Sequence, residues 1–397
     1  MEFLFERSRQ KLKQTQLTFV RGIMDNISWN ARLIGIKGAR GVGKTTLLLQ
    51  YMKKHLPRDH RSIYVSLDNL WFAEHKLVDF ADSFVKQGGQ YLFLDEVHKY
   101  PNWSQEVKNI YDDYADLKIV FTGSSLLEIL TSRADLSRRA ITYEMQGFSF
   151  REYLNRNLKM NLPVFSLEQI LHSHGERSEE ILTHLKVFEH FPEYLKNGYY
   201  PFYNEAPPLY PQKINEVINM ILEIELPMLR GVETAFVARV KQLLQIISES
   251  APFVPNTTKL SERIGITRNS LLSYLYALEE SHLTIHLHKK ASGISKLQKP
   301  DKILLENTNL IYALAGDAVQ RGNVRETFFA NQLKASHKIQ YPEKGDFLVN
   351  GTHAFEVGGK NKGLKQISDM PEAYIAADGI EYGFGNKIPI WLFGFLY

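Results

Sequence analysis

The chain has 397 residues, of which 44% are hydrophobic and 23% charged, a composition typical of a folded globular protein with about two to four domains. It has no cysteine, which excludes disulfides and thiolate zinc sites, and its net charge of +4 permits nucleic acid as a partner without requiring it. The charged N-terminal stretch does not resemble a signal peptide, and the longest apolar stretch is too short to span a bilayer. We therefore expect a cytoplasmic protein with no membrane partner.

Strand and helix patterns alternate through the first 150 residues. Apolar stretches typical of buried strands cover residues 33–39, 62–68, 91–97 and 118–125. Helical patterns lie between them, and this alternation predicts a parallel sheet with both faces covered. We expect an α/β domain over residues 1–150.

The first strand runs into GARGVGKTT, which matches the phosphate-loop pattern G-x-x-x-x-G-K-[ST]. Glycines allow successive backbone N–H groups to face a phosphate, and the start of the following helix adds a favourable dipole. We expect Lys44 to reach the β- and γ-phosphates of ATP and the Thr45 hydroxyl to hold Mg²⁺. The residues expected to bind the nucleotide are Gly38, Gly41, Val42, Gly43, Lys44, Thr45 and Thr46.

Two acidic residues end the third strand, where a parallel sheet places its ligands. Asp95 is expected to hold Mg²⁺, and Glu96 is expected to polarise the attacking water. In the next strand, Thr122, Ser124 or Ser125 is a candidate to sense the γ-phosphate, although these hydroxyls could equally cap a helix.

Three arginines follow in SRADLSRRA: Arg133, Arg138 and Arg139. One of them could act as an arginine finger on a neighbouring subunit, which would make the protein a homo-oligomer. The alternative is a solvated basic loop.

Residues 20–150 resemble the AAA-superfamily ATPases of bacteria and archaea, in the segments RLIGIKGARGVGKTTLLLQ, YLFLDEVHKYPNWSQEVKNIYDDY and KIVFTGSS. The resemblance implies ATP binding and hydrolysis, and it favours Arg139 as the finger. It also implies that a helical segment, a winged helix and a restriction-endonuclease-like region follow.

The middle of the chain divides into a helical segment, residues 151–232, and a winged helix-turn-helix, residues 233–295. Gly265 falls where two helices must turn, and Thr267 is expected to cap the second helix. The candidate DNA contacts are Arg268, Asn269, Lys289 and Lys290. Few basic residues lie on the recognition helix, so a packing module is an equally open interpretation.

Residues 296–397 are expected to form a small α/β nuclease-like domain. Its pieces are a helix with Glu326, a strand ending in Asp346, a strand with Glu356, and a helix with Gln366. In nuclease cores of this kind two acids hold a metal and a lysine two residues after the second acid steadies the hydroxide. Position 358 is glycine here, and the lysine expected to replace it is Lys360. This displacement favours a degenerate site over an active one.

Three functions stay open. The leading hypothesis is Mg²⁺-dependent ATP hydrolysis that rearranges the winged-helix and nuclease-like module, with DNA as the partner. The second is an ATP-gated DNA nuclease. The third is a nucleotide-switched scaffold that binds a protein partner.

Overall fold

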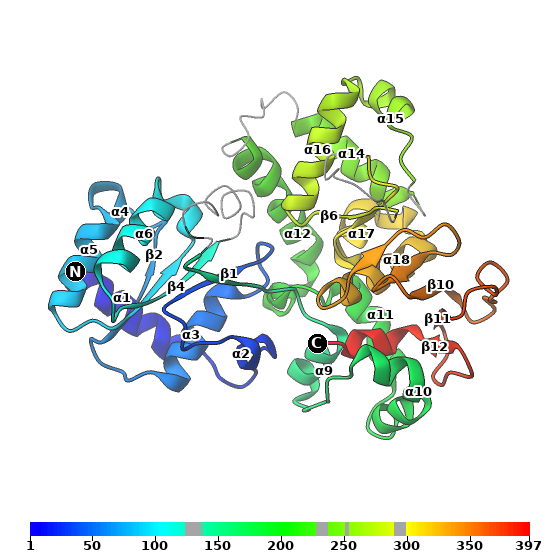
Figure 1. The fold of residues 1–397 in the computed structure, drawn as a ribbon, viewed down its shortest axis with the longest axis horizontal. Coiled ribbons are helices and arrows are strands. Elements are labelled where there is room, and N and C mark those ends of the chain that lie inside the picture. Colours follow the sequence, from blue (N-terminus) through cyan, green and yellow to red (C-terminus); the bar gives the residue numbers. More distant parts are fainter. Residues whose placement is uncertain (124–135, 137, 228–236, 251–253, 290–298) are drawn as a thin grey trace. The chain divides into compact units, whose positions relative to one another are not determined.

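The structure is a computed structural model of the chain, and it describes residues 1–123, 136, 138–227, 237–250, 254–289 and 299–397. The chain divides into two compact units, Met1–Gly147 and Phe148–Tyr397 (Figure 1). The first unit corresponds closely to the α/β domain expected over residues 1–150. The three domains expected after it form one compact unit.

A five-stranded parallel sheet is the centre of the first unit, in the order β2-β3-β4-β1-β5. Its strands are β1 (Leu33–Lys37), β2 (Ser62–Ser66), β3 (Tyr91–Asp95), β4 (Lys118–Gly123) and β5 (Ile141–Glu144). The parallel sheet and the first four strands confirm the prediction. The fifth strand was not predicted, because its side chains are mostly exposed and it lacks a buried apolar run.

Helices surround this sheet (Figure 1). They are α1 (Glu2–Gln14), α2 (Ile23–Asn26), α3 (Lys44–His55), α4 (Trp71–Glu74), α5 (Leu77–Lys86), η1 (Val97–Lys99) and α6 (Trp103–Asp113). The N-terminal helix α1 packs against β2 and α3. The core includes the aromatic side chains of Phe80, Phe84, Trp103 and Phe121, and burying each of them stabilises the fold by roughly 1.5–3 kcal/mol.

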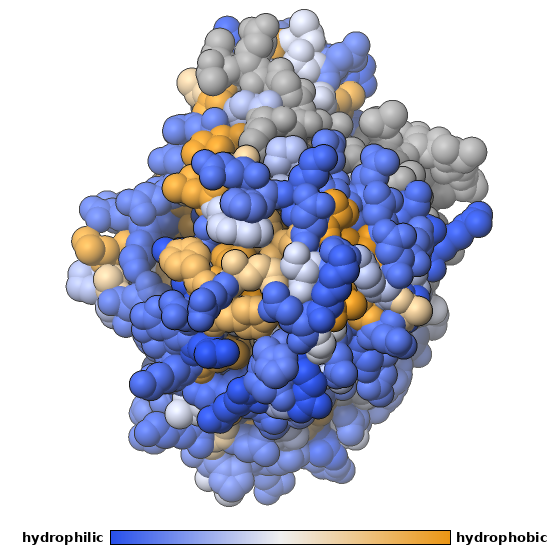
Figure 2. Space-filling model, turned by 90° about the vertical axis from the view of Figure 1, so that its left-hand side faces the viewer, coloured by the Kyte–Doolittle hydropathy of each residue, from blue (hydrophilic) through white to orange (hydrophobic). Residues whose placement is uncertain are grey.

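The molecular surface in Figure 2 is mostly hydrophilic, with a patch of hydrophobic side chains in the middle of the view. Such patches are common, because a folded protein has too few polar atoms to cover its whole surface. None of the described helices is long and apolar enough to cross a membrane.

The second unit begins with helices, as predicted. They are α9 (Phe150–Leu158), α10 (Leu167–Leu182), α11 (Val187–Asn197), η2 (Pro201–Glu205), η3 (Pro207–Leu209), α12 (Tyr210–Met220) and η4 (Ile221–Glu225). The C-terminal turn η7 (Ile390–Phe395) packs against α9 and α10. The Phe165 N–H donates to the Phe395 carbonyl (2.9 Å), so the predicted helical segment and the end of the chain share one core.

Three helices and a two-stranded antiparallel sheet follow. They are α14 (Val237–Glu249), α15 (Thr257–Ile264), α16 (Arg268–Glu280), β6 (Thr284–Leu287) and β7 (Lys302–Leu305). Gly265 ends α15 in the left-handed conformation (φ 71°), and the Thr267 hydroxyl accepts the Ser270 N–H at the start of α16 (3.1 Å), which confirms both predicted roles. Because β6 pairs with β7, the predicted boundary at residue 296 falls between two paired strands.

A mixed sheet of order β12-β11-β10-β9-β8 completes the second unit. Its strands are β8 (Ile339–Gln340), β9 (Phe347–Val349), β10 (His353–Gly359), β11 (Ala373–Asp378) and β12 (Lys387–Pro389), and its helices are α17 (Thr308–Ala315), η6 (Gly316–Ala318) and α18 (Arg321–Lys334). Phe329 of α18 packs against Phe347 and Phe355, which joins the helix to the sheet.

The helix expected around Gln366 is wrong. Residues 364–370 form successive turns, in which Ile367 donates to Leu364 and Met370 to Ile367. The segment lies between Gly363 and Pro371, and a proline disfavours a helical conformation of the residue before it.

Candidate functional site

The phosphate loop connects β1 to α3 at the carboxyl edge of the sheet. Gly41 (φ 83°) and Gly43 (φ 100°) adopt left-handed conformations that glycine tolerates best. A side chain at Gly38 would collide with the carbonyl oxygen of Met145. Val42 is buried, which anchors the loop, while Thr46 is exposed. The loop therefore has the curled backbone that exposes N–H groups to an anion.

Arg21 stabilises this loop through hydrogen bonds to backbone carbonyls, a role that the sequence did not indicate. Its guanidinium is buried and donates to the carbonyls of Val42 (3.0 Å), Gln146 (2.8 Å) and Gly147 (2.8 Å). Three carbonyl acceptors from two separate segments hold the loop against the end of β5. No local sequence pattern signals such a contact, since its partners are backbone atoms far along the chain.

Lys44 is buried at the start of α3, and its ammonium donates to the carbonyls of Gly38 and Ala39, both at 2.8 Å. The side chain thus lies along the inside of the loop, where a bound phosphate would lie. Thr45 follows on the same helix turn and turns its hydroxyl toward Asp95.

Asp95, at the end of β3, is held by three hydroxyl groups. Thr45 and Tyr64 each donate to Oδ2 at 2.6 Å, and Thr122 donates to Oδ1. Burial, followed by the charge of Asp95, raises the pKa of Tyr64 far above its usual value, so this hydroxyl stays a donor. Carboxylate and hydroxyl oxygens are the ligands that Mg²⁺ prefers, and Asp95 and Thr45 therefore fit the metal predicted for them.

Glu96 has a left-handed backbone (φ 54°), which is rare outside glycine and is found preferentially at functional sites. Its carboxylate lies 3.5 Å from Nε2 of His98, a residue absent from the sequence prediction. Burial, then the charges of Lys99, Lys44 and Arg40, lower the pKa of His98 to about 3. The imidazole is therefore neutral at pH 7 and lies beside the Glu96 carboxylate without neutralising its charge.

Thr122 lies between the two acids, because its hydroxyl donates to Asp95 and accepts the Glu96 N–H (3.3 Å). The other hydroxyl candidates, Ser124 and Ser125, lie outside the described residues, as does Arg133.

Arg139 forms a two-pronged ion pair with Asp112, with nitrogen–oxygen distances of 2.9 and 3.0 Å. Asp112 lies in the last turn of α6. This helix leads from the carboxyl end of β3 to the amino end of β4. Arg139 therefore lies at the sheet edge opposite the phosphate loop of its own chain.

In the second unit, Asp346 and Glu356 lie side by side across two antiparallel strands. Asp346 precedes β9 rather than ending a strand, because β9 runs from Phe347 to Val349. Its N–H donates to the Phe355 carbonyl (2.9 Å), and its carboxylate accepts the Val357 N–H (2.8 Å). Burial and the nearby Asp346 raise the pKa of Glu356, which is fully buried in β10, although its hydrogen bond to Lys362 opposes them.

The lysine that contacts Glu356 is Lys362, not the predicted Lys360. Lys362 Nζ lies 2.5 Å from Glu356 Oε2, whereas Lys360 is exposed in the turn after β10. A Cβ atom on Gly358 would lie 2.8–2.9 Å from Cβ, Cγ and Cδ of Lys362. The Lys362 N–H donates to the Gly359 carbonyl (2.9 Å), which closes a turn. This turn places the Lys362 side chain over Gly358, the position that a lysine occupies in nuclease cores of this kind.

Glu326 of α18 has a different partner. It pairs with the buried Lys302 of β7, with a nitrogen–oxygen distance of 2.5 Å. Burial raises the pKa of Glu326, the charge of Lys302 opposes that rise, and Asp346 adds to it. Across the described part of the chain, no three His, Asp or Glu side chains are grouped as metal ligands. Asp346 and Glu356 remain as a pair of carboxylates, and Mg²⁺ bound by one or two carboxylates usually keeps several waters.

The candidate DNA contacts are on the surface. Arg268 and Asn269 are exposed in the first turn of α16, and Lys289 is exposed after β6. The Lys289 N–H donates to Asp301 (2.8 Å), and Lys290 lies outside the described residues. The exposed side chains are available to a partner, and two of the three, Arg268 and Lys289, are basic.

The AAA domain family matches residues 30–154. Among solved structures, a Walker-type ATPase of Pyrococcus abyssi is 12% identical over 78% of this chain and 95% of its own (TM-score 0.40). The ORC1 protein of Aeropyrum pernix, solved with DNA, is 13% identical over 79% and 92% (TM-score 0.31), and AMPPCP-bound DnaA of Aquifex aeolicus is 15% identical over 68% and 86% (TM-score 0.26). No curated protein matches the chain. Residues 30–154 thus match the AAA domain family, and this match covers less than half of the chain.

Proposed function

We propose that the first unit binds Mg²⁺–ATP and hydrolyses it, and that the second unit responds to this cycle. The observation that carries the proposal is the arrangement around β3. Asp95 is held by hydroxyls from three elements, and Glu96 stands next to it beside a neutral His98. A site that only bound nucleotide would not need an oriented second carboxylate.

In the proposed mechanism, backbone N–H groups of the phosphate loop and Lys44 hold the β- and γ-phosphates. Thr45 and Asp95 would hold Mg²⁺, which when bound would offset the negative charge of the phosphates. Glu96 accepts a proton from the attacking water as general base. His98 fixes the direction of the Glu96 carboxylate and, being neutral, leaves its negative charge intact.

The test is Glu96→Gln, which keeps the size of the side chain and removes its basicity. Losing a general base costs about 10²- to 10⁴-fold in rate. We expect phosphate release to fall by that factor while a fluorescent ATP analogue still binds, and Lys44→Ala to lose binding as well. Glu74→Gln, an exposed acid on α4, is the matched control and should change neither. Unaltered turnover in Glu96→Gln would disprove the assigned role.

We also propose that Arg139 acts on the nucleotide of a neighbouring copy. Support comes from its place at the sheet edge opposite its own phosphate loop, since a finger that acts in trans is supplied by another chain. Its pairing with Asp112 has to open for this contact. Arg139→Ala should lower ATP turnover only at protein concentrations high enough for the chains to associate. Mixing Arg139→Ala chains with Lys44→Ala chains should restore activity, because the Lys44→Ala chains supply the arginine that the nucleotide sites of the Arg139→Ala chains lack.

DNA is the proposed partner of the second unit, supported by the exposed Arg268 and Asn269 at the start of α16. Phosphate contacts are strongest at low salt. Retention of a DNA duplex at low salt, weakened in Arg268→Gln, would support this role. Absence of retention with and without ATP would favour a protein partner instead.

Metal-dependent DNA cleavage is the second candidate function, and one observation favours it. Lys362 reaches Glu356 over Gly358, which gives the pair of acids the lysine that the linear spacing lacks. With Mg²⁺ or Mn²⁺, cleavage of plasmid and single-stranded DNA should vanish in Asp346→Ala and Lys362→Ala and persist in Lys360→Ala. Cleavage unaffected by Asp346→Ala would come from elsewhere.

A further inference from the structure

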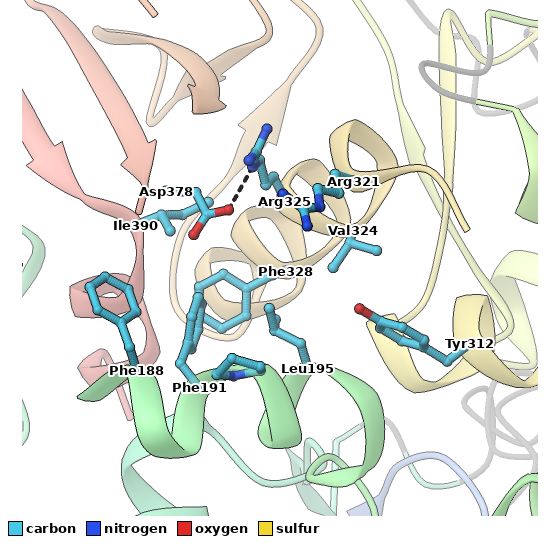
Figure 3. Close-up of a pocket in the computed structure, with 11 residues that line it drawn as sticks. Phe188, Phe191, Leu195, Tyr312, Arg321, Val324, Arg325, Phe328, Asp378 and Ile390 are labelled. Atoms are coloured by element: carbon cyan, nitrogen blue, oxygen red, sulfur yellow. Dashed lines mark hydrogen bonds and ion pairs between the residues drawn. The ribbon is translucent and has the colours of Figure 1, made fainter. Parts of the chain in front are cut away.

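A half-open cavity of about 230 Å³ lies in the second unit, outside the sites described so far (Figure 3). Helix α11 forms one side, α18 lies across from it, α17 contributes Tyr312, and Asp378 and Ile390 come from the end of the mixed sheet and η7. This volume is below the range of about 300–1,000 Å³ typical of drug-sized ligands. The cavity therefore suits a single flat ring system.

Aromatic side chains line the cavity. Phe191 and Phe328 are buried and meet edge to face, with ring centres 5.0 Å apart, so they form a rigid base. Phe188 and Tyr312 are only half-buried and stand on opposite sides of the opening (Figure 3). The Tyr312 phenol points into the cavity and has no hydrogen-bond partner among the residues that the structure describes. A ring entering here would meet aromatic faces and one polar group able to contact its edge.

Two arginines lie at the rim. Arg321 and Arg325 occupy successive turns of α18 and therefore face the same side. Arg325 uses Nε to bind Asp378 (2.8 Å), while its two terminal nitrogens lie 3.5 Å from where a Cβ on Gly359 would stand. Arg321 is exposed, with no ion pair to any described residue, so both guanidinium groups have donors available.

A second cavity of about 420 Å³ shares Arg321, Arg325 and Asp378 with the first. It continues past the turn after β10 and adds Lys360 and Lys362. Four cations and one acid line the two cavities. Arg325 and Lys362 are paired with Asp378 and Glu356, so Arg321 and Lys360 supply the excess of positive charge, which favours a phosphate. The aromatic cavity and the basic rim thus share Arg321, Arg325 and Asp378.

We propose that this pair of cavities binds a nucleobase together with its adjoining phosphate. The base enters between Phe188 and Tyr312 above Phe191 and Phe328, and the phosphate lies against Arg321 and the terminal nitrogens of Arg325. Aromatic rings stack on any base, whereas adjacent arginines select for the phosphate. The ligand is a nucleoside monophosphate, free or at the end of a single strand.

The proposed binding is independent of ATP hydrolysis. It rests on the proposed DNA cleavage only in one case: if the ligand is the end of a DNA strand, that strand would be the substrate that is cleaved. The rim leads to Lys362, which contacts Glu356, so a strand held by its last base would extend toward the two acids. A binding measurement without divalent metal separates the two questions, because cleavage cannot then occur.

The experiment uses the full chain with Lys44→Ala, which silences the phosphate loop, in EDTA at low salt. Isothermal titration with AMP tests the free nucleotide, and fluorescence anisotropy with a 5′-phosphorylated single-stranded hexanucleotide tests the strand end. Adenosine and inorganic phosphate, added separately, show whether both parts of the ligand are needed.

Two variants report on the two halves of the site. Phe188→Leu keeps an apolar side chain and removes a stacking face, which should weaken binding about 5-fold or more. Arg321→Gln should weaken it about 10-fold, the lower end for a bond to a charged group, because this arginine is exposed. Phe384→Leu and Lys196→Gln make the same kinds of change at exposed positions outside the cavities and should leave binding unchanged.

Binding of AMP that both variants weaken would support a free nucleotide as ligand, and the same pattern with the hexanucleotide alone would support a strand end. No binding of either ligand, or binding that both variants leave intact, would overturn the proposal. Circular dichroism of each variant checks that its fold is retained.

Discussion

Replacing Lys362 should loosen the sheet around Glu356, while the same change two residues earlier should not. Lys362→Gln removes the only cation seen within ion-pair distance of Glu356 among the described residues. Lys360→Gln removes an equal charge from an exposed turn that lacks this contact. The pair of variants therefore separates loss of the ion pair from a general change in charge.

The size of the effect follows from burial. Glu356 is 0% exposed, and the Lys362 side chain is 32% exposed. Breaking a fully buried ion pair costs about 3–5 kcal/mol, whereas exposed pairs contribute about 0–1 kcal/mol. Because water can partly replace this lysine, we expect about 2 kcal/mol for Lys362→Gln, which is about 30-fold in the opening equilibrium of β10.

Acid should reverse the defect. Burial raises the pKa of Glu356, and loss of the lysine raises it further. Such a carboxyl group has a higher pKa in the folded state than in the unfolded state, so its negative charge destabilises the folded state. It is protonated, and this destabilisation is lost, as the pH falls through its pKa in the folded state. The difference between Lys362→Gln and the parent chain should therefore shrink as the pH falls from 7.5 toward 5.5.

Hydrogen exchange measured by mass spectrometry on peptides covering β10 and β11 is the assay, because it reports local opening within one unit. Each variant is compared with the parent chain at the same pH. Equal protection in Lys362→Gln and Lys360→Gln would refute the assigned pairing, as would a defect that persists unchanged at the lower pH.

Three further changes test other parts of the structure. The pKa of His98 is lowered to about 3 in the folded chain, so between about pH 6.5 and 3 its imidazole is protonated only in the unfolded chain. In that range the free energy of unfolding should fall by up to about 1.4 kcal/mol for each pH unit that the pH is lowered. His98→Asn should flatten that slope in urea unfolding at pH 7.5, 6.0 and 5.0, and parallel curves would contradict the buried neutral imidazole. Tyr64→Phe removes one donor to Asp95 and should destabilise the first unit by about 1.5–3 kcal/mol, with weaker binding of a fluorescent ATP analogue; unchanged stability and affinity would count against the contact. Gly358→Ala places a Cβ against the Lys362 side chain and should lower the hydrogen-exchange protection of β10 by about 1–3 kcal/mol. Gly363→Ala, where a Cβ meets no neighbouring atom, is the control. Equal effects of the two changes would mean that Lys362 does not pack over Gly358.

The nucleotide site could be located from sequence because its chemistry is local. Gly41, Gly43, Lys44 and Thr45 are consecutive or nearly so, and the backbone conformation of the loop depends on these residues themselves. Asp95 and Glu96 were found for a related reason, since the carboxyl ends of parallel strands meet at one edge. The turn at Gly265 was equally local.

The partners of these groups could not be found in this way, because contacts between distant segments leave no periodic pattern. Tyr64 reaches Asp95 only because β2 lies beside β3, and Arg21 reaches Val42 across more than twenty residues. His98 follows Glu96 closely, but its neutral state comes from burial that the sequence does not show.

For this protein, the sequence by itself determined the parallel sheet of the first unit, the phosphate loop and the two acids that follow β3. The tertiary structure decided which lysine serves Glu356. Strand alternation pointed to Lys360, but β10 ends at Gly359 and the next turn reverses the chain, so Lys362 covers Gly358 instead. The physical reason is that periodicity predicts which side chains share a face only while the strand continues, whereas after it ends the turn sets their direction.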